Sequence, residues 1–211
     1  MSKTTFLYGD SLQLAKEDGM DLRIKDKVCV ISDGAKGIGL GIAKLWAREG
    51  GISVILSRLT MDKDLENEFK NLYENFGFYQ IDLKEYEKIK KLIGEIYQKY
   101  GLIYALVNNA DANDNLHIKN SSTRDLIKFY ENNLFHYYTL AKECLPYIKK
   151  EKGSVLVSKT ALIGQNECLR LSKSRSNRLY KRVACAFAKN EVRTNALSPA
   201  EVITSLYEKW L

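Results

Sequence analysis

This sequence is poor in the residues that build metal sites and disulfide frameworks. Among its 211 residues there are only two histidines, two prolines and four cysteines. Two histidines are too few for a histidine-based metal site, and the cysteines lack the paired spacing of a zinc site. We therefore expect no bound metal. We interpret the four cysteines as reduced thiols rather than disulfide partners; they are Cys29, Cys144, Cys168 and Cys185.

Long apolar segments are absent as well. No run of about 18 apolar residues occurs, so we expect no membrane contact or span. The N-terminus lacks the apolar core of a secretion signal, which favours a cytoplasmic protein. The net charge of +7 is unevenly spread, because residues 169–182 alone carry six lysines or arginines and no acid. Without aromatic residues interleaved on a basic face, this charge does not favour a nucleic-acid partner.

What the chain does contain is a regular alternation of strand and helix patterns with short connections. This alternation predicts an α/β fold with a Rossmann-like, doubly wound parallel sheet of about six strands. The strand-like segments are residues 28–31, 53–56, 78–81, 104–107, 154–157 and 192–197, and the helical segments are residues 38–48, 62–76, 86–100 and 123–149. We expect one domain over residues 20–211, preceded by an N-terminal extension over residues 1–19 that ends before a second methionine.

A glycine-rich turn follows the first strand and opens the first helix. It contains Gly34, Gly37 and Gly39, and such turns let the backbone approach a pyrophosphate at a helix N-terminus. Asp33 stands where this kind of turn normally has a glycine. We expect a positive φ there, at a cost of about 1–2 kcal/mol, and a carboxylate facing the phosphate site.

Polar residues mark the ends of later strands. Asn108 and Asn109 follow the fourth strand, where they could tie neighbouring strands together or form a plain turn. Asn133 lies inside the long helix, where it could bend the helix and hold a water or simply face solvent. Ser158 ends the fifth strand, and residues 199–204 leave the sixth at the same carboxyl edge, where ligands bind in open α/β sheets.

Together these motifs resemble the short-chain dehydrogenase/reductase family over residues 20–211. Ser-Lys-Thr-Ala-Leu at 158–162, Pro-Ala-Glu-Val at 199–202 and Leu-Tyr-Glu-Lys-Trp at 206–210 are most similar to its sugar dehydrogenase branch, typified by L-fucose dehydrogenase. The resemblance implies hydride transfer from a sugar or similar secondary alcohol to a nicotinamide cofactor. The family's last strand has no counterpart here, so we expect a C-terminally truncated domain. Family members are homo-oligomers, and the altered sequence at residues 166–183 makes assembly of this chain doubtful.

The resemblance also assigns catalytic positions: Asn133 to the asparagine, Ser158 to the serine and Lys173 to the lysine. The family's tyrosine, its general acid/base, is replaced by Leu169, which cannot exchange a proton. The codons for residues 166–183 can also be read from their second base, with the first base of the next codon as the third. With permitted codon choices, this shifted frame can encode TSAYASAKAAQIAFTREW, which restores Tyr-x-x-x-Lys. We therefore infer two compensating frameshifts, a hypothesis that the encoding DNA can test.

Cofactor contacts follow from the same resemblance. The expected positions are Ser32, Asp33, Lys36, Gly37, Ile38, Gly39, Ser57, Arg58, Asp82, Leu83, Asn109, Ala110, Lys173, Pro199, Val202 and Thr204. Arg58, rather than an acid, ends the second strand, and an arginine there suits a 2′-phosphate. We therefore expect NADP in slight preference to NAD, although Arg58 and Lys36 could equally be solvated surface charges. The alternative functions are a non-catalytic nucleotide-binding relic and, on charge alone, a basic binding protein.

Overall fold

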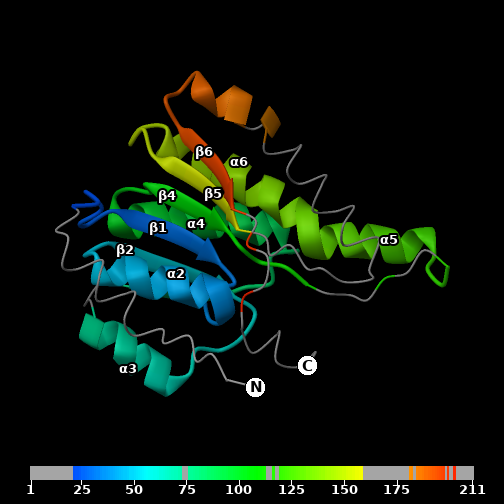
Figure 1. The fold of residues 1–211 in the computed structure, drawn as a ribbon, viewed down its shortest axis with the longest axis horizontal. Coiled ribbons are helices and arrows are strands. Elements are labelled where there is room, and N and C mark those ends of the chain that lie inside the picture. Colours follow the sequence, from blue (N-terminus) through cyan, green and yellow to red (C-terminus); the bar gives the residue numbers. More distant parts are fainter. Residues whose placement is uncertain are drawn as a thin grey trace, which may run out of the picture.

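Six parallel strands form one sheet in the order β3-β2-β1-β4-β5-β6 (Figure 1). The computed structural model describes residues 21–72, 76–112, 116, 119–158, 181–182, 184–197, 199 and 202. The strands are β1 (Val28–Ser32), β2 (Ile52–Ser57), β3 (Gly77–Gln80), β4 (Ala105–Asn108), β5 (Ser154–Ser158) and β6 (Arg193–Leu197). The predicted strands agree with these bounds to within one residue at each end.

Helices cover both faces of the sheet. They are α2 (Gly37–Arg48), α3 (Lys63–Leu72), α4 (Tyr86–Tyr100), α5 (Thr123–Tyr130), the π-helix η1 (Glu131–Phe135) and α6 (His136–Ile148). In Figure 1, α2 and α3 lie in front of the sheet, whereas α4 and α6 lie behind it. The doubly wound α/β fold expected from the sequence is therefore confirmed. No helix among the described residues is both long and apolar enough to cross a bilayer.

The strands are apolar on both faces because both faces are covered. In β1, Val28 and Val30 face the core shared with α4 and α6, while Cys29 and Ile31 face the core shared with α2. All of these side chains are fully buried. Cys29 and Cys144 are buried free thiols and Cys185 is an exposed one, as expected, whereas Cys168 lies outside the described residues.

The helix predicted as one piece over residues 123–149 is interrupted. α5 passes through the five-residue π-helix η1 before α6 begins, and Asn133 lies at its centre. The Asn133 side-chain nitrogen donates to the Phe129 carbonyl at 3.1 Å. In an α-helix that carbonyl would accept the backbone N–H of Asn133, so the side chain competes for it and favours the wider turn.

The strand order reverses between β1 and β4, and this reversal positions the site. β1 pairs with β2 on one side and with β4 on the other, and the chain continues outward from β1 in both directions. In such sheets a crevice opens at the carboxyl ends of the strands beside the switch point. The residues at the ends of β1 and β4 are therefore the first place to look for a ligand site.

Candidate functional site

The turn after β1 contains two residues with an unusual backbone conformation. Asp33 has φ of +52° and Gly37 has φ of +54°, both in the left-handed region. The positive φ expected at Asp33 is thus confirmed. The Asp33 amide donates to the Leu56 carbonyl at 2.7 Å, which fixes the turn against β2 despite the strained residue.

Ser32 and Asn109 join this turn to the end of β4. The Ser32 hydroxyl accepts the backbone N–H groups of Asn109 at 2.9 Å and of Ala110 at 3.0 Å. The Asn109 side-chain nitrogen in return donates to the Ser32 and Asp33 carbonyls at 3.3 and 3.4 Å. The expected tie between neighbouring strands is therefore present, and the alternative of a plain turn after β4 is wrong.

Gly39 is packed so closely that it leaves no space for a side chain. A Cβ atom there would lie 2.5 Å from the Asp33 carbonyl oxygen and 2.6 Å from the Asn109 side-chain nitrogen. Because the closest contact is backbone, the turn itself would have to move. The glycine is therefore required by the junction of the turn with β4.

We predict that Gly39→Ala lowers the free energy of unfolding by about 1–3 kcal/mol, the usual cost of overpacking. Gly41 is the matched control, because it lies in the same helix and a Cβ there would meet nothing within 4 Å. Gly41→Ala should stabilise the protein by about 0.5–1 kcal/mol through helix propensity. Urea unfolding measures both, and equal effects of the two variants would contradict the close packing described here.

The N-terminus of α2 carries no capping bond from the side chain of its own N-cap residue, Lys36, and its first turn contains no acid. By contrast, α5 carries a complete capping box between Ser122 and Asp125. Free amides and a helix dipole together suit an anion such as a phosphate.

Two further asparagines are buried behind this edge. The Asn108 side-chain nitrogen donates to the Tyr137 carbonyl at 3.1 Å, which ties β4 to α6. The Asn133 side-chain oxygen accepts the Ala112 amide at 2.9 Å and so ties η1 to the segment after β4. Asn133 is fully buried, so the interpretation of a solvent-facing asparagine is wrong.

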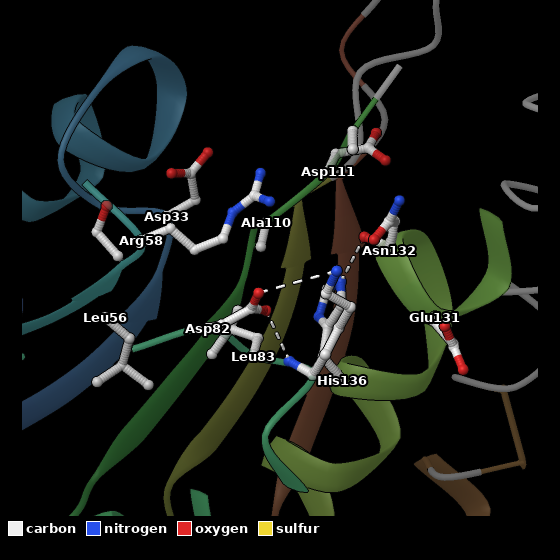
Figure 2. Close-up of a pocket in the computed structure, with 13 residues that line it drawn as sticks. Asp33, Leu56, Arg58, Asp82, Leu83, Ala110, Asp111, Glu131, Asn132 and His136 are labelled. Carbon is white, nitrogen blue, oxygen red and sulfur yellow. Dashed lines mark hydrogen bonds and ion pairs between the residues drawn. The ribbon is translucent and has the colours of Figure 1, made fainter. Parts of the chain in front are cut away.

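A pocket opens at the carboxyl ends of β1, β2, β3 and β4 (Figure 2). Six of the expected cofactor residues line it together: Asp33, Ser57, Arg58, Asp82, Leu83 and Ala110. The other expected residues adjoin the pocket: Ser32 ends β1, Asn109 follows β4, and Lys36, Gly37, Ile38 and Gly39 form the start of α2. The structure thus brings the residues expected at four strand ends to one place.

Other residues line the pocket that the sequence interpretation did not assign to the cofactor. They are Leu56, Lys84, Asp111, Ala112, Glu131, Asn132 and His136. Lys84 lies in the short segment between β3 and α4, next to the expected residues Asp82 and Leu83, so the strand-end rule could have found it. Glu131, Asn132 and His136 lie in or next to η1, and His136 is one turn beyond Asn133. The His136 Nε2 atom lies 3.0 Å from the Asn132 carbonyl.

The pocket carries opposed charges. Burial raises the pKa of the Asp33 carboxyl above its ordinary value, and the nearby Lys36 and Arg58 act in the opposite direction. Figure 2 shows the Asp33 and Arg58 side chains projecting to the same side of the pocket. Asp82 accepts the Lys84 amide at 3.0 Å and pairs with its ammonium group at 3.8 Å. The acid at position 33 therefore lies beside two basic side chains, Lys36 and Arg58, that attract an anion.

Ser158 ends β5 at the same edge of the sheet. Its side chain is 2% exposed, and its hydroxyl has no hydrogen-bond partner among the described residues. Buried polar groups are normally hydrogen-bonded, so this hydroxyl is a candidate to bind a ligand. Pro199 and Val202 are partly buried. Leu169, Lys173 and Thr204 lie outside the described residues, so their placement stays a prediction.

Comparisons with known proteins agree with this arrangement. The crystal structure of Cj0485 dehydrogenase matches with a TM-score of 0.86 at 58% identity, over 90% of this chain and 75% of that one. The ligand-free aldohexose dehydrogenase of Thermoplasma acidophilum matches with a TM-score of 0.78 at 27% identity, over 89% of this chain and 71% of that one. An L-fucose dehydrogenase of Bos taurus is 27% identical over 195 residues, which cover 90% of this chain and 71% of its own. The sequence profile of the short chain dehydrogenases matches residues 27–211, and the chain therefore belongs to this family of NAD(P)-dependent oxidoreductases.

Proposed function

We propose that this chain binds a nicotinamide cofactor at the carboxyl edge of its sheet to oxidise a sugar or similar secondary alcohol, and that its own residues impair this reaction. The observation that carries the proposal is the buried Ser158 hydroxyl, which has no hydrogen-bond partner among the described residues and lies at the edge where the turn after β1 meets Asn109. A hydroxyl that can bind the substrate and a turn whose backbone can approach a phosphate then lie on the same edge of the sheet. L-fucose is the first substrate to test, because an L-fucose dehydrogenase is among the relatives.

The residues present fit such a cofactor at several points. Gly39 lets the start of α2 pack against the Asp33 carbonyl and Asn109, and the uncapped start of α2 would offer its amides to the phosphates. Asp82, Leu83 and Ala110 would line the adenosine end, and Lys173, Pro199, Val202 and Thr204 the nicotinamide end. When bound, the cofactor would supply the hydride acceptor.

The proton chemistry depends on this chain's own side chains. Ser158 would donate a hydrogen bond to the substrate oxygen, and Lys173 would hold the nicotinamide ribose. Asn133 would position a water for the proton relay, beside the bond that it already makes to the Ala112 amide. Leu169 cannot take the hydroxyl proton, so we expect a rate at least about 10²–10⁴ lower than with an acid/base in place.

Turnover measurements test this proposal. Purified protein is mixed with L-fucose or D-arabinose and each oxidised cofactor, with Cj0485 dehydrogenase as the active reference at 58% identity. We expect reduction of the cofactor to be at least about 100-fold slower than in the reference. Turnover equal to that of the reference would contradict the impairment and would require another proton acceptor.

Arg58 supports a preference for NADP over NAD. It lines the pocket with Asp33 and directly follows β2, where a 2′-phosphate would lie. We predict that Arg58→Ala weakens NADPH binding by about tenfold or more, because a hydrogen bond to a charged group contributes about 1.5–3 kcal/mol. NADH binding should change much less. Equilibrium titration with both cofactors measures the ratio.

Arg124 provides the control, since it is an exposed arginine on α5 and does not line the pocket. Arg124→Ala should leave both affinities unchanged. An equal loss of NADH and NADPH affinity in Arg58→Ala would contradict a contact with the 2′-phosphate and would leave Arg58 as a general phosphate-attracting charge.

A non-catalytic nucleotide-binding relic is the second candidate. Asp33 favours it, because a partly buried carboxylate with positive φ stands at the phosphate turn. The relic would bind a nicotinamide nucleotide without turnover even after the tyrosine is restored. The impaired enzyme would regain turnover, so restoration of the tyrosine separates the two candidates.

A further inference from the structure

A second cavity lies between α2 and the β4–β6 half of the sheet, and we call it the α2 groove. It has a volume of about 440 Å³ and shares no lining residue with the pocket described above. Ile42, Leu45 and Trp46 of α2 form one wall. This volume lies within the range of about 300–1,000 Å³ that is usual for small-molecule sites, which are lined mostly by apolar side chains with a few polar groups.

The floor of the α2 groove consists of two rows of side chains that run across β4, β5 and β6. The first row lies at the amino ends of the strands, where parallel pairing aligns Ala105, Ser154 and Arg193. The second row is two residues further along the same strands and consists of Val107, Leu156 and Asn195. The groove therefore has its charged floor residue at the amino edge of the sheet, opposite the edge that carries the nucleotide pocket.

A cation and a hydroxyl meet at this amino end. The Arg193 guanidinium donates a hydrogen bond to the Tyr104 hydroxyl at 2.9 Å, and both residues line the groove. Because the hydroxyl accepts this bond, its own proton can be donated to a ligand. Arg193 forms no ion pair with an acid among the residues that the structure describes. Several guanidinium donors and a phenol donor together match a carboxylate, whose oxygens act only as acceptors.

The rest of the groove matches an apolar chain attached to that carboxylate. From Glu49 at the amino end to Ile42, α2 extends about 10 Å, enough for the extended chain of a medium-length fatty acid. Glu49 lines the same end as Arg193, so a head group with a single negative charge is repelled less than a doubly charged phosphate. We propose that the α2 groove binds a medium-chain monocarboxylate, with its carboxylate on Arg193 and Tyr104 and its alkyl chain along α2.

Isothermal titration calorimetry of the full chain with decanoate tests this proposal, and we expect one saturable site per chain. Arg193→Gln should weaken decanoate binding by about tenfold or more, because it removes hydrogen bonds from a charged donor. The same variant should leave the binding of decanol unchanged, since decanol has the same chain and no charge. Tyr104→Phe should weaken decanoate binding by about two- to tenfold, and it tests the head-group contact independently if Arg193→Gln is unstable. Glu49→Gln should strengthen decanoate binding.

Changes elsewhere provide the controls. Leu45→Glu should weaken the binding of decanoate and decanol alike by at least about tenfold, because it puts a charge in the apolar wall. Leu45 is 42% exposed, so the chain should tolerate this change, and Ile127→Glu, at a similarly exposed position on α5, should weaken neither ligand. Arg48→Gln is the matched control for Arg193, because Arg48 is exposed on α2 and does not line the groove. It should change neither affinity.

Three results would overturn the proposal. The first is the absence of saturable decanoate binding, or equal loss of decanoate and decanol affinity in Arg193→Gln. The second is competition between decanoate and NADPH, which would place the fatty acid in the nucleotide pocket. The third is decanoate binding that appears only when the protein is diluted, which would indicate that a second copy of the chain covers the groove.

Discussion

Replacement of residues 166–183 by TSAYASAKAAQIAFTREW is expected to raise the rate of hydride transfer from L-fucose by about 10²–10⁴. The replacement puts a tyrosine at position 169 and keeps Lys173 four residues later, where its charge can lower the phenol pKa. It also removes most of the excess positive charge of this segment. Steady-state reduction of NADP and NAD measures the gain.

A matched variant separates the tyrosine from its surroundings. The same replacement with phenylalanine at position 169 keeps the restored helix sequence but lacks the hydroxyl. We expect it to bind cofactor as the tyrosine form does and to remain as slow as the parent chain. An equal gain with phenylalanine would show that folding of the segment, rather than proton transfer, limits the parent.

Asp33→Gly is expected to strengthen NADPH binding by at least about tenfold. The reason is electrostatic: two unit charges about 5 Å apart repel by about 3 kcal/mol at an effective dielectric of 20. The same change should stabilise the protein by about 1–2 kcal/mol, because glycine adopts the φ of +52° without strain. Equilibrium titration and urea unfolding measure the two effects separately.

Asp33→Asn isolates the charge, since asparagine keeps the size and tolerates positive φ. Burial raises the pKa of the Asp33 carboxyl, so its charged form is disfavoured in the folded state. The Asn variant should therefore be more stable than the wild type at neutral pH. This advantage should shrink as the pH falls through the raised pKa, and it should vanish below the ordinary carboxyl pKa. A constant difference across this range would contradict a charge effect.

The parts of the site that could be predicted are those set by residues close together in the chain. The turn after Ser32 was predictable because strand, glycine turn and helix follow one another. Its approach to Asn109 was predictable because parallel strands place their carboxyl ends on one edge of the sheet. The positive φ of Asp33 was predictable because the turn needs it whatever residue stands there.

The parts that could not be predicted depend on contacts between distant segments. The π-helix at Asn133 requires the Ala112 amide as a partner for the side-chain oxygen, and periodicity along the helix cannot show that bond. His136 lines the pocket only because η1 directs the start of α6 toward the ends of β3 and β4. Their participation follows from tertiary packing rather than from a motif.

Equilibrium binding of NADPH to the unmodified chain tests the central claim most directly. The claim is that the turn after β1, the Ser32–Asn109 junction and the start of α2 still form a nicotinamide nucleotide site, although the acid/base is missing. Titration followed by the fluorescence of the reduced nicotinamide should show saturable binding at one site per chain, strengthened by Asp33→Gly. The absence of saturable binding in both the parent and Asp33→Gly would contradict the claim.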